Sequence, residues 1–243
     1  MALLHGEPKI VTDNLVLCLD AGNTKSYPGT GTSWTDMING HTATMIDASW
    51  YLSVNGGVMD FDGTDDRITL PNTAQPNGLG STFSIEIWHY LSNSTAPGSM
   101  WTYGSLFTNG GGASDWNSGA GNNNGLIIGF DIMNSRNQSG TEVWKTYSPA
   151  PSVQTWHQYV FTLNSGTGNM YIDKNNVMSN NTDFRTNYGQ VTGTTGIGLA
   201  DVYNGTVRGE YDGLISVVRI YDKVLSTAEI EQNFDATKTR FGL

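Results

Sequence analysis

The chain has 243 residues, with 14% charged, 37% hydrophobic and 11% aromatic residues, and its formal net charge is −10. Because few residues are charged, Asn, Thr, Ser and Gly supply most of the surface polarity, and these residues favour turns and strands over helices. The sequence has no cluster of Lys and Arg, which argues against a nucleic-acid partner and against an anionic membrane surface. The excess of acidic residues either holds divalent cations or simply keeps the protein soluble.

Residues 1–14 contain two leucines followed by Glu7, Pro8 and Lys9, which is neither a signal peptide nor a membrane span. We therefore expect the protein to fold inside the cell that makes it. The single cysteine, Cys18, lies in the apolar run Leu15–Leu19. It cannot form an internal disulfide, and we expect it to pack as a small core residue.

Short β-rich runs recur along the whole chain, separated by Gly and Asn clusters. They indicate an all-β fold, a two-sheet antiparallel β-sandwich. No repeat or linker divides them, so we expect one domain over residues 1–243, with its core at about 14–234. The clearest expected strands are, in chain order, Leu15–Leu19, Gly57–Phe61, Arg67–Leu70, Thr82–Tyr90, Ser105–Thr108, Leu126–Ile132, Val143–Tyr147, Trp156–Leu163, Asn169–Ile172, Thr195–Leu199 and Leu214–Tyr221.

The segment from Trp156 to Val177 predicts a β-meander. Tyr159, Phe161 and Leu163 alternate and should share one face of a strand. The turn at Asn164–Gly168 leads to a partner strand that contains Met170 and Ile172, and the turn at Asp173–Asn176 then leads into Val177.

One helix is predicted from Thr227 to about Lys238. Ser226 and Glu229 have the spacing of a capping box, and Leu225 and Ile230 have that of a hydrophobic staple. Ile230 and Phe234 lie four residues apart on one face, so we expect this short C-terminal helix to pack against the sandwich.

Two long irregular stretches, Asn109–Gly125 and Asn134–Gly140, either bind a ligand or are mobile surface loops. Sugar recognition combines an aromatic ring, stacked on the sugar, with hydrogen bonds from amide groups. Seven Trp must also be accommodated, and core packing is the usual place for them. The candidate glycan-binding residues are Trp116 and Asn117, in the Gly/Asn-rich loop, and Trp101, Tyr103 and Trp144, which are near it in sequence.

Four motifs follow one another in a fixed order over about Leu15 to Phe234. They are Leu17–Asn23 (LCLDAGN), Phe61–Leu70 (FDGTDDRITL), Phe83–Trp88 (FSIEIW) with Trp156–Val160 (WHQYV) and Met170–Asp173 (MYID), and Tyr211–Ile230. In these motifs the chain resembles the laminin-G-like branch of the concanavalin A-like lectin/glucanase superfamily. The resemblance implies a jelly-roll β-sandwich in which Trp88 and Trp156 are structural.

The two ends of the chain narrow the resemblance. Asp20–Gly29 with Trp34–Asp36, and Asn233–Gly242, are similar to laminin-G-like domains in virion proteins of tailed phages. This implies a non-enzymatic capsid decoration, fibre or tail component on the virion surface. Its partners would be other virion proteins or further copies of itself, with a cell-surface glycan as a further ligand. The alternatives are a soluble glycan-binding lectin and a diverged glycoside hydrolase.

Glucanases of this superfamily use two carboxylates on one strand, about 5 Å apart in a retaining enzyme. Glu86 is the only acid in Ser84–Tyr90, and Trp88 stands two residues on. The four His are scattered, and His89 and His157 are better explained as hydrogen-bonded structural residues. We therefore expect no catalytic residues and no enzyme.

The resemblance also implies a calcium site, with Asp20, Asn23, Asp62 and Asp212 as the candidate ligands. The family's closing motif usually has two acids after the first Ile. This chain has Ser216 and Val217 there, which places any site that depends on those acids in doubt.

Overall fold

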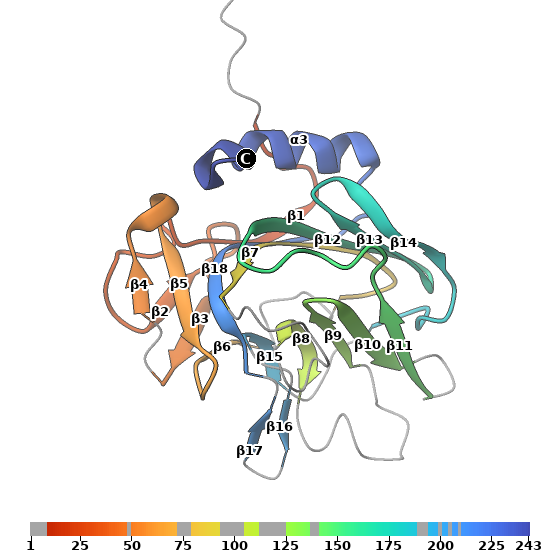
Figure 1. Cartoon of the computed structure of the whole chain (residues 1–243), viewed down its shortest axis with the longest axis horizontal. Helices are drawn as coiled ribbons and strands as arrows, with labels where there is room; N and C mark the ends of the chain where they lie inside the picture. Colours follow the sequence, from red (N-terminus) through yellow and green to blue (C-terminus); the bar gives the residue numbers. More distant parts are fainter. Residues whose placement is uncertain are drawn as a thin grey trace, which may run out of the picture.

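The computed structural model describes residues 9–47, 50–71, 79–92, 105–111, 125–136, 141–188, 194–198, 201–203, 206–208 and 210–243. The strands form two eight-stranded antiparallel sheets, here called sheet A and sheet B, and a separate small pair. The two large sheets are stacked, and a C-terminal helix covers the outside of sheet A (Figure 1). This arrangement confirms the expected jelly-roll β-sandwich with one short helix.

Sheet A has the order β14-β13-β12-β7-β18-β5-β4, and β1 also pairs with β18. Its central strands are the longest, because β7 and β18 are covered on both faces. The strands of sheet A are β1 (Leu15–Asp20), β4 (Trp50–Leu52), β5 (Val58–Asp62), β7 (Thr82–Leu91), β12 (Trp156–Asn164), β13 (Thr167–Ile172), β14 (Asn175–Asn181) and β18 (Asp212–Tyr221).

Sheet B has the order β11-β10-β9-β8-β15-β6-β3-β2. A short 3-10 helix, η1 (Val54–Gly56), joins β4 to β5 of sheet A, and β16 (Asp201–Tyr203) pairs with β17 (Thr206–Arg208) apart from both sheets. The strands of sheet B are β2 (Ser33–Thr35), β3 (Thr42–Ile46), β6 (Arg67–Leu70), β8 (Ser105–Gly111), β9 (Leu126–Gly129), β10 (Ile132–Arg136), β11 (Glu142–Thr146) and β15 (Thr194–Ile197).

The meander β12-β13-β14 confirms the local prediction. Tyr159, Phe161 and Leu163 are all buried in the core between the sheets. Both connections are two-residue hairpin turns whose residues have positive φ: Ser165 and Gly166 in the first, Asp173 and Lys174 in the second. β14 therefore begins at Asn175, two residues earlier than Val177.

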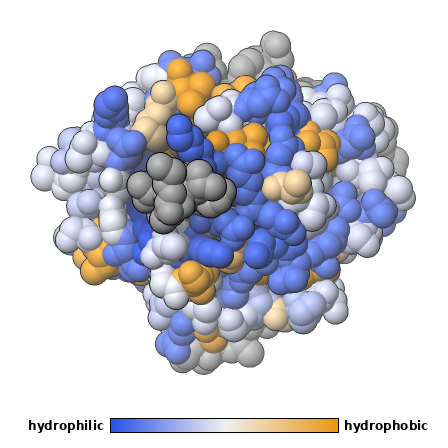
Figure 2. Space-filling view, turned by 90° about the horizontal axis from the view of Figure 1, so that it is seen from above, coloured by the Kyte–Doolittle hydropathy of each residue, from blue (hydrophilic) through white to orange (hydrophobic). Residues whose placement is uncertain are grey.

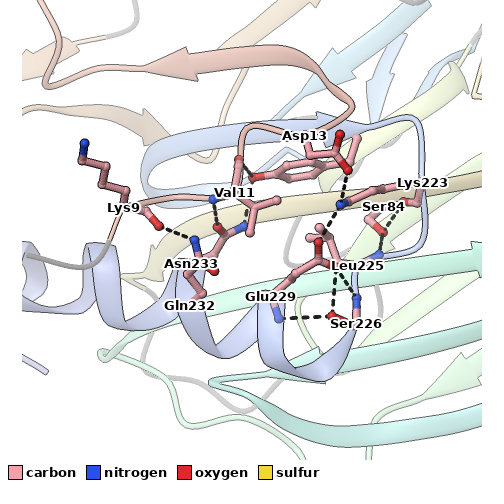
Figure 3. Close-up of polar contacts among 11 residues, drawn as sticks. Lys9, Val11, Asp13, Ser84, Lys223, Leu225, Ser226, Glu229, Gln232 and Asn233 are labelled. Carbon is pink, nitrogen blue, oxygen red and sulfur yellow. Dashed lines mark hydrogen bonds and ion pairs between the residues drawn. The ribbon is translucent and has the colours of Figure 1, made fainter.

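The C-terminal helix α3 (Thr227–Thr237) begins with the predicted capping box. The Ser226 hydroxyl accepts a hydrogen bond from the Glu229 N–H, and the Glu229 carboxylate accepts one from the Ser226 N–H at 2.8 Å (Figure 3). Leu225 and Ile230 belong to one buried cluster, as a hydrophobic staple requires. A 3-10 turn, η3 (Lys238–Phe241), continues the helix.

Aromatic stacking holds α3 and η3 on the outer face of sheet A. The ring of Trp88 lies 5.5 Å from that of Phe234 and 4.8 Å from that of Phe241. The Trp156 ring stacks on Phe241 at 4.2 Å. Trp88 and Trp156 are thus structural, as the resemblance implied. Seen from the helix side, the molecular surface is mostly hydrophilic, with hydrophobic residues in separate small spots (Figure 2).

The expected strand Leu126–Ile132 is wrong, because this run is a hairpin of β9 and β10 with Phe130 and Asp131 at the turn. Gly129 and Asp131 mark the turn, and Phe130 between them is buried like a strand residue. Both expected irregular stretches begin within strands, since residues 109–111 belong to β8 and residues 134–136 belong to β10. Within the described ranges, no helix has the length and apolar character needed to cross a membrane.

Candidate functional site

Of the five candidate glycan-binding residues, Trp144 is the one that the structure describes. It lies in β11, at the edge of sheet B, and is 41% exposed although it is large and aromatic. Trp101, Tyr103, Trp116 and Asn117 lie outside the described residues. The candidate site is therefore built outward from Trp144.

Strand register places Trp144 at one end of a row of residues that crosses sheet B. Directly paired residues of antiparallel strands point to the same face. The intervening positions, such as Phe107 and Ile128, are buried in the core between the sheets, so the row lies on the outer face, away from sheet A. From β2 to β11 the row reads Ser33, Thr44, Thr69, Gly196, Thr108, Ile127, Asn134 and Trp144.

The composition of this row suits sugar recognition. It carries hydroxyl groups, one amide and one exposed indole, and it contains no charged side chain. Asn134 is the direct cross-strand neighbour of Trp144. Its side chain is fully buried, and neither its Oδ1 nor its Nδ2 has a hydrogen-bond partner. A buried amide without partners costs about 1–3 kcal/mol, so a hydroxyl-bearing ligand that reached it would gain from pairing with it.

The four expected calcium ligands do not lie together. Asp62 faces Asp212 directly across β5 and β18. Asp20 instead pairs with Val217, in the middle of β18, and the Asn23 Oδ1 accepts a hydrogen bond from the Lys25 N–H at 3.0 Å.

Arg240 of η3 occupies the surroundings of Asp20. Its guanidinium donates to the Asp20 carboxylate at 2.6 Å, to the Asn55 and Gly57 carbonyls at 2.6 Å each, and to the Ser216 hydroxyl at 2.7 Å. These acceptors are all oxygens, the donor set that a hard cation would use. Here the Arg240 guanidinium, and not a metal ion, supplies the positive charge among these oxygens. One of the acceptors is Ser216, which stands where the family usually has an acid.

Glu86, the acid on the strand where glucanases keep their catalytic pair, is fully buried. Its Oε1 accepts hydrogen bonds from Trp88 at 3.0 Å, Gln158 at 2.9 Å and Arg219 at 2.8 Å. Its Oε2 accepts one from Asn233 of α3 at 2.8 Å. A carboxylate held by four donors beneath a helix anchors that helix.

A pocket of about 400 Å³ lies between the 149–152 loop and the β13–β14 turn. Beside it, the His157 Nδ1 is 2.6 Å from the Asp173 carboxylate and its Nε2 is 3.0 Å from the Ser152 hydroxyl, which is the connectivity of a Ser-His-Asp triad. The same Nε2 also lies 2.9 Å from the Ser152 carbonyl oxygen. The imidazole therefore bridges the loop backbone to the sheet, as expected of a structural histidine.

His89 is the other histidine that the sequence marked as structural. It is fully buried, and its Nδ1 lies 2.9 Å from the Tyr211 hydroxyl. Burial, with a smaller contribution from His157, holds the pKa of His89 well below its usual value. The ring is therefore neutral at pH 7, packed edge-on against Tyr159.

The sequence interpretation missed two residues of these sites. Asn134 was expected in a loop, and only the register of β9, β10 and β11 places it beside Trp144. Arg240 was part of a motif but had no role assigned, since its partner Asp20 is 220 residues away along the chain.

Comparison with solved structures shows the same fold in proteins of low sequence identity. Domain 4 of AbnA, a GH43 extracellular arabinanase from Geobacillus stearothermophilus solved with arabinotriose, is 15% identical with a TM-score of 0.58, covering 92% of this chain and 98% of that one. Trypanosoma rangeli sialidase in complex with sialic acid is 15% identical with a TM-score of 0.64, covering 95% of this chain and 34% of that one.

The binding domain of Paraclostridial Mosquitocidal Protein 1 is 13% identical with a TM-score of 0.61, covering 91% of this chain and 52% of that one. The chain thus spans about a third of the sialidase and about half of the toxin domain. At these identities the likeness concerns the fold alone. No curated protein matches the sequence.

The family model described as Laminin_G_3, of the concanavalin A-like lectin/glucanases superfamily, matches residues 62–231. The match begins at the end of β5 and ends within α3, so it includes the strands from β6 to β18, which belong to both large sheets, and the first turn of the helix that covers sheet A. The chain belongs to this laminin-G-like family.

Proposed function

We propose that this domain is a non-catalytic carbohydrate-binding module whose glycan site lies on the outer face of sheet B, around Trp144 and Asn134. The observation that carries the proposal is the pairing of a 41% exposed indole with a buried amide that has no hydrogen-bond partner. The indole supplies a flat apolar surface for a sugar ring, and the amide supplies a donor and an acceptor for its hydroxyls. The arabinotriose bound to the structurally similar arabinanase domain supports this class of ligand.

A glycan array followed by calorimetry on the best ligand tests the proposal. Trp144→Ala should weaken binding by at least about fivefold, because stacking on an indole contributes roughly 1 kcal/mol or more. Leu52→Ala is the matched control, since Leu52 is also an exposed hydrophobic residue (37%) but lies in sheet A. Trp116→Ala tests the loop residue expected from the sequence. A blank array, or a Trp144→Ala variant that binds like the wild type, would overturn the assignment.

The non-catalytic part of the proposal rests on Glu86, whose carboxylate is enclosed by four donors. We expect no hydrolysis of laminarin-type β-glucans. A measurable rate that falls in Glu86→Gln would show instead that the domain is a diverged glycosidase.

We further propose that the domain is a virion component of a tailed phage, displayed in several copies and bound to other virion proteins. The support is the sequence resemblance of Asp20–Gly29 and Asn233–Gly242, two segments that contact each other through Asp20 and Arg240. Added to purified virions that lack it, the protein should bind them. A monodisperse monomer at high concentration that fails to bind such virions would contradict this placement.

A further inference from the structure

The pocket beside His157 has two walls that are tied to each other at both ends. At one end the Ser148 N–H donates to the Val177 carbonyl of β14 at 3.1 Å. At the other end the hydroxyl and the carbonyl oxygen of Ser152 lie 3.0 and 2.9 Å from the His157 Nε2. Between these ties the 149–152 segment and the strands leave a space of about 400 Å³. This volume lies in the range of small-molecule sites, roughly 300–1,000 Å³.

The walls of the pocket are mainly apolar. Ile172 and Val177 of the β13–β14 hairpin are buried on one side, and Pro149, Ala150 and Pro151 form the other. A proline has no backbone N–H, so these two prolines offer a ligand no hydrogen-bond donor. Walls of this kind accommodate an aliphatic chain and leave the recognition of a polar group to the few polar side chains of the pocket.

These polar side chains already use their donors on one another. The His157 Nδ1 lies 2.6 Å from the Asp173 carboxylate, which can only accept, so Nδ1 carries the proton and donates it. The Ser152 hydroxyl lies against Nε2 of the same ring, and the Asn175 Nδ2 donates to the Asp173 carbonyl at 3.2 Å. The groups that remain for a ligand are acceptors: the Asn175 Oδ1 and the further lone pairs of the Asp173 carboxylate, whose side chain is 27% exposed.

The charge of the pocket has the same sense. Asp173 lines it, no Lys or Arg does, and His157, the partner of Asp173, is the one basic side chain around it. Lys174, the next residue in sequence, points toward α3. Its Nζ lies 4.8 Å from the centre of the Phe234 ring and 3.9 Å from the Asp235 carboxylate. A ligand therefore meets a carboxylate that no lysine of the hairpin covers.

We infer that this pocket binds an aliphatic primary ammonium group, that of a lysine side chain or of a free alkylamine. An ammonium has three donors and no acceptor, which matches side chains that offer acceptors. A guanidinium fits less well, because it needs both oxygens of one carboxylate, and those of Asp173 already accept from the Gln158 N–H and from His157. A sugar hydroxyl also needs a donor, and the side-chain donors of the pocket are already used.

Titration of n-butylammonium chloride into the full chain, followed by the NMR shifts of the backbone amides, tests the inference. The amides of Ala150, Ser152 and residues 173–177 should shift to saturation, with a dissociation constant in the millimolar range, as expected of a ligand with five heavy atoms. n-Butanol has the same chain without the charge and should bind at least about tenfold more weakly, since charge-assisted hydrogen bonds are the stronger ones.

Asn175 allows two variants with opposite effects. Asn175→Asp adds a second carboxylate and should tighten the binding of n-butylammonium about threefold. Asn175→Lys places an ammonium group of the chain itself in the pocket and should abolish the binding. Asn176→Lys is the matched control, because Asn176 is the neighbouring exposed asparagine of β14 and does not line the pocket. At about 0.1 M NaCl, which screens distant charges, it should bind like the wild type. Thermal unfolding establishes that each variant is folded.

Two blocked peptides separate the sources of the ammonium group. Acetyl-Gly-Lys-Gly-amide should bind more tightly than n-butylammonium if the pocket accepts the lysine of a protein partner, and should not bind if it accepts a free alkylamine. The same peptide with norleucine in place of lysine should not bind. No shift with n-butylammonium well above the millimolar range, equal shifts with n-butanol, or unchanged binding in Asn175→Lys would refute the inference. None of these results bears on the glycan proposal, since no sugar is used and Trp144 lies in sheet B.

Discussion

At the scale of single residues, Arg240 joins the last turn of the chain to its first strand. Its guanidinium bonds Asp20 and three further oxygens, and the side chains of Arg240 and Asp20 are each only 20% exposed. Arg240→Ala should lower the free energy of unfolding by about 2–4 kcal/mol, because it leaves a partly buried carboxylate and several carbonyls without a donor. Urea unfolding followed by tryptophan fluorescence measures this loss.

Two further variants, Arg240→Lys and Arg67→Ala, are compared with Arg240→Ala. A lysine ammonium cannot span the four acceptors that the planar guanidinium reaches, so Arg240→Lys should recover less than half of the loss. Arg67→Ala removes a more exposed ion pair, in which Asp47 is 51% exposed, and should cost no more than about 1 kcal/mol. If Arg240→Ala cost no more than Arg67→Ala, the guanidinium would not be the cation that holds this corner together.

At the scale of elements, one buried polar side chain, Asn233, adds hydrogen bonds to the aromatic stack that holds α3 on sheet A. Asn233 donates to Glu86 and to the Tyr221 hydroxyl. Its Oδ1 accepts a hydrogen bond from the Val11 N–H at 2.7 Å (Figure 3). Asn233→Ala should cost about 2–4 kcal/mol, since it leaves the buried Glu86 Oε2 and the Val11 N–H without their partner and removes one hydrogen bond from the Tyr221 hydroxyl. The neighbouring Gln232→Ala removes one exposed hydrogen bond to the Lys9 carbonyl and should cost less than about 1 kcal/mol.

Hydrogen exchange separates detachment of the helix from loss of the whole fold. In Asn233→Ala the amides of α3 should exchange faster while those of the central strand β7 remain protected. Equal protection of α3 in Asn233→Ala and in Gln232→Ala would mean that the aromatic stack of Trp88 with Phe234 and Phe241 attaches the helix by itself.

The elements also show what a sequence can predict. The start of α3 was predictable, because Ser226 and Glu229 form their contacts within one turn of the chain. The β9–β10 hairpin was missed, because Phe130, between Gly129 and Asp131 at its turn, is apolar and buried like a strand residue. The candidate glycan site was likewise predicted only in part. Trp144 could be chosen from the sequence as an aromatic residue, but its position beside Asn134 depends on strand register.

The sequence interpretation missed β2 and β3 and placed the start of β14 too late. β2 and β3 are short, and β3 shows only Ala43 and Met45 as buried alternate positions. β14 is rich in Asn, a turn-forming residue, and it begins within the expected turn because β13 offers it a partner edge. The calcium candidates were likewise chosen by resemblance, whereas the local fold of the Asp62–Asp66 turn decides which carboxylates converge.

At the scale of the whole molecule, stability should fall as the pH is lowered from 7.5 to 5.5, and His89 should be a principal cause. Its pKa in the folded protein lies well below the usual 6.5, so the contribution of neutral His89 to stability is present above pH 6.5 and is lost as the pH falls below it. In the unfolded chain the imidazole of His89 binds a proton as the pH falls, whereas the buried imidazole of the folded protein stays neutral. This difference is on the order of 1 kcal/mol over the interval.

The contribution of His89 is isolated by comparing how the free energy of unfolding changes with pH in different variants. The raised pKa of Asp66, about 6, acts in the opposite sense, since its protonated form is favoured by folding. The measured quantity is therefore the change in unfolding free energy between pH 7.5 and 5.5, compared among the wild type, His89→Gln and His41→Gln. His89→Gln should reduce the fall in stability by about 1 kcal/mol whatever its absolute stability. His41→Gln, at a partly exposed histidine, is the control. If the slope were unchanged in His89→Gln, the proton uptake would belong to other groups, and the neutral, enclosed ring between the two sheets would not govern how this molecule responds to acid.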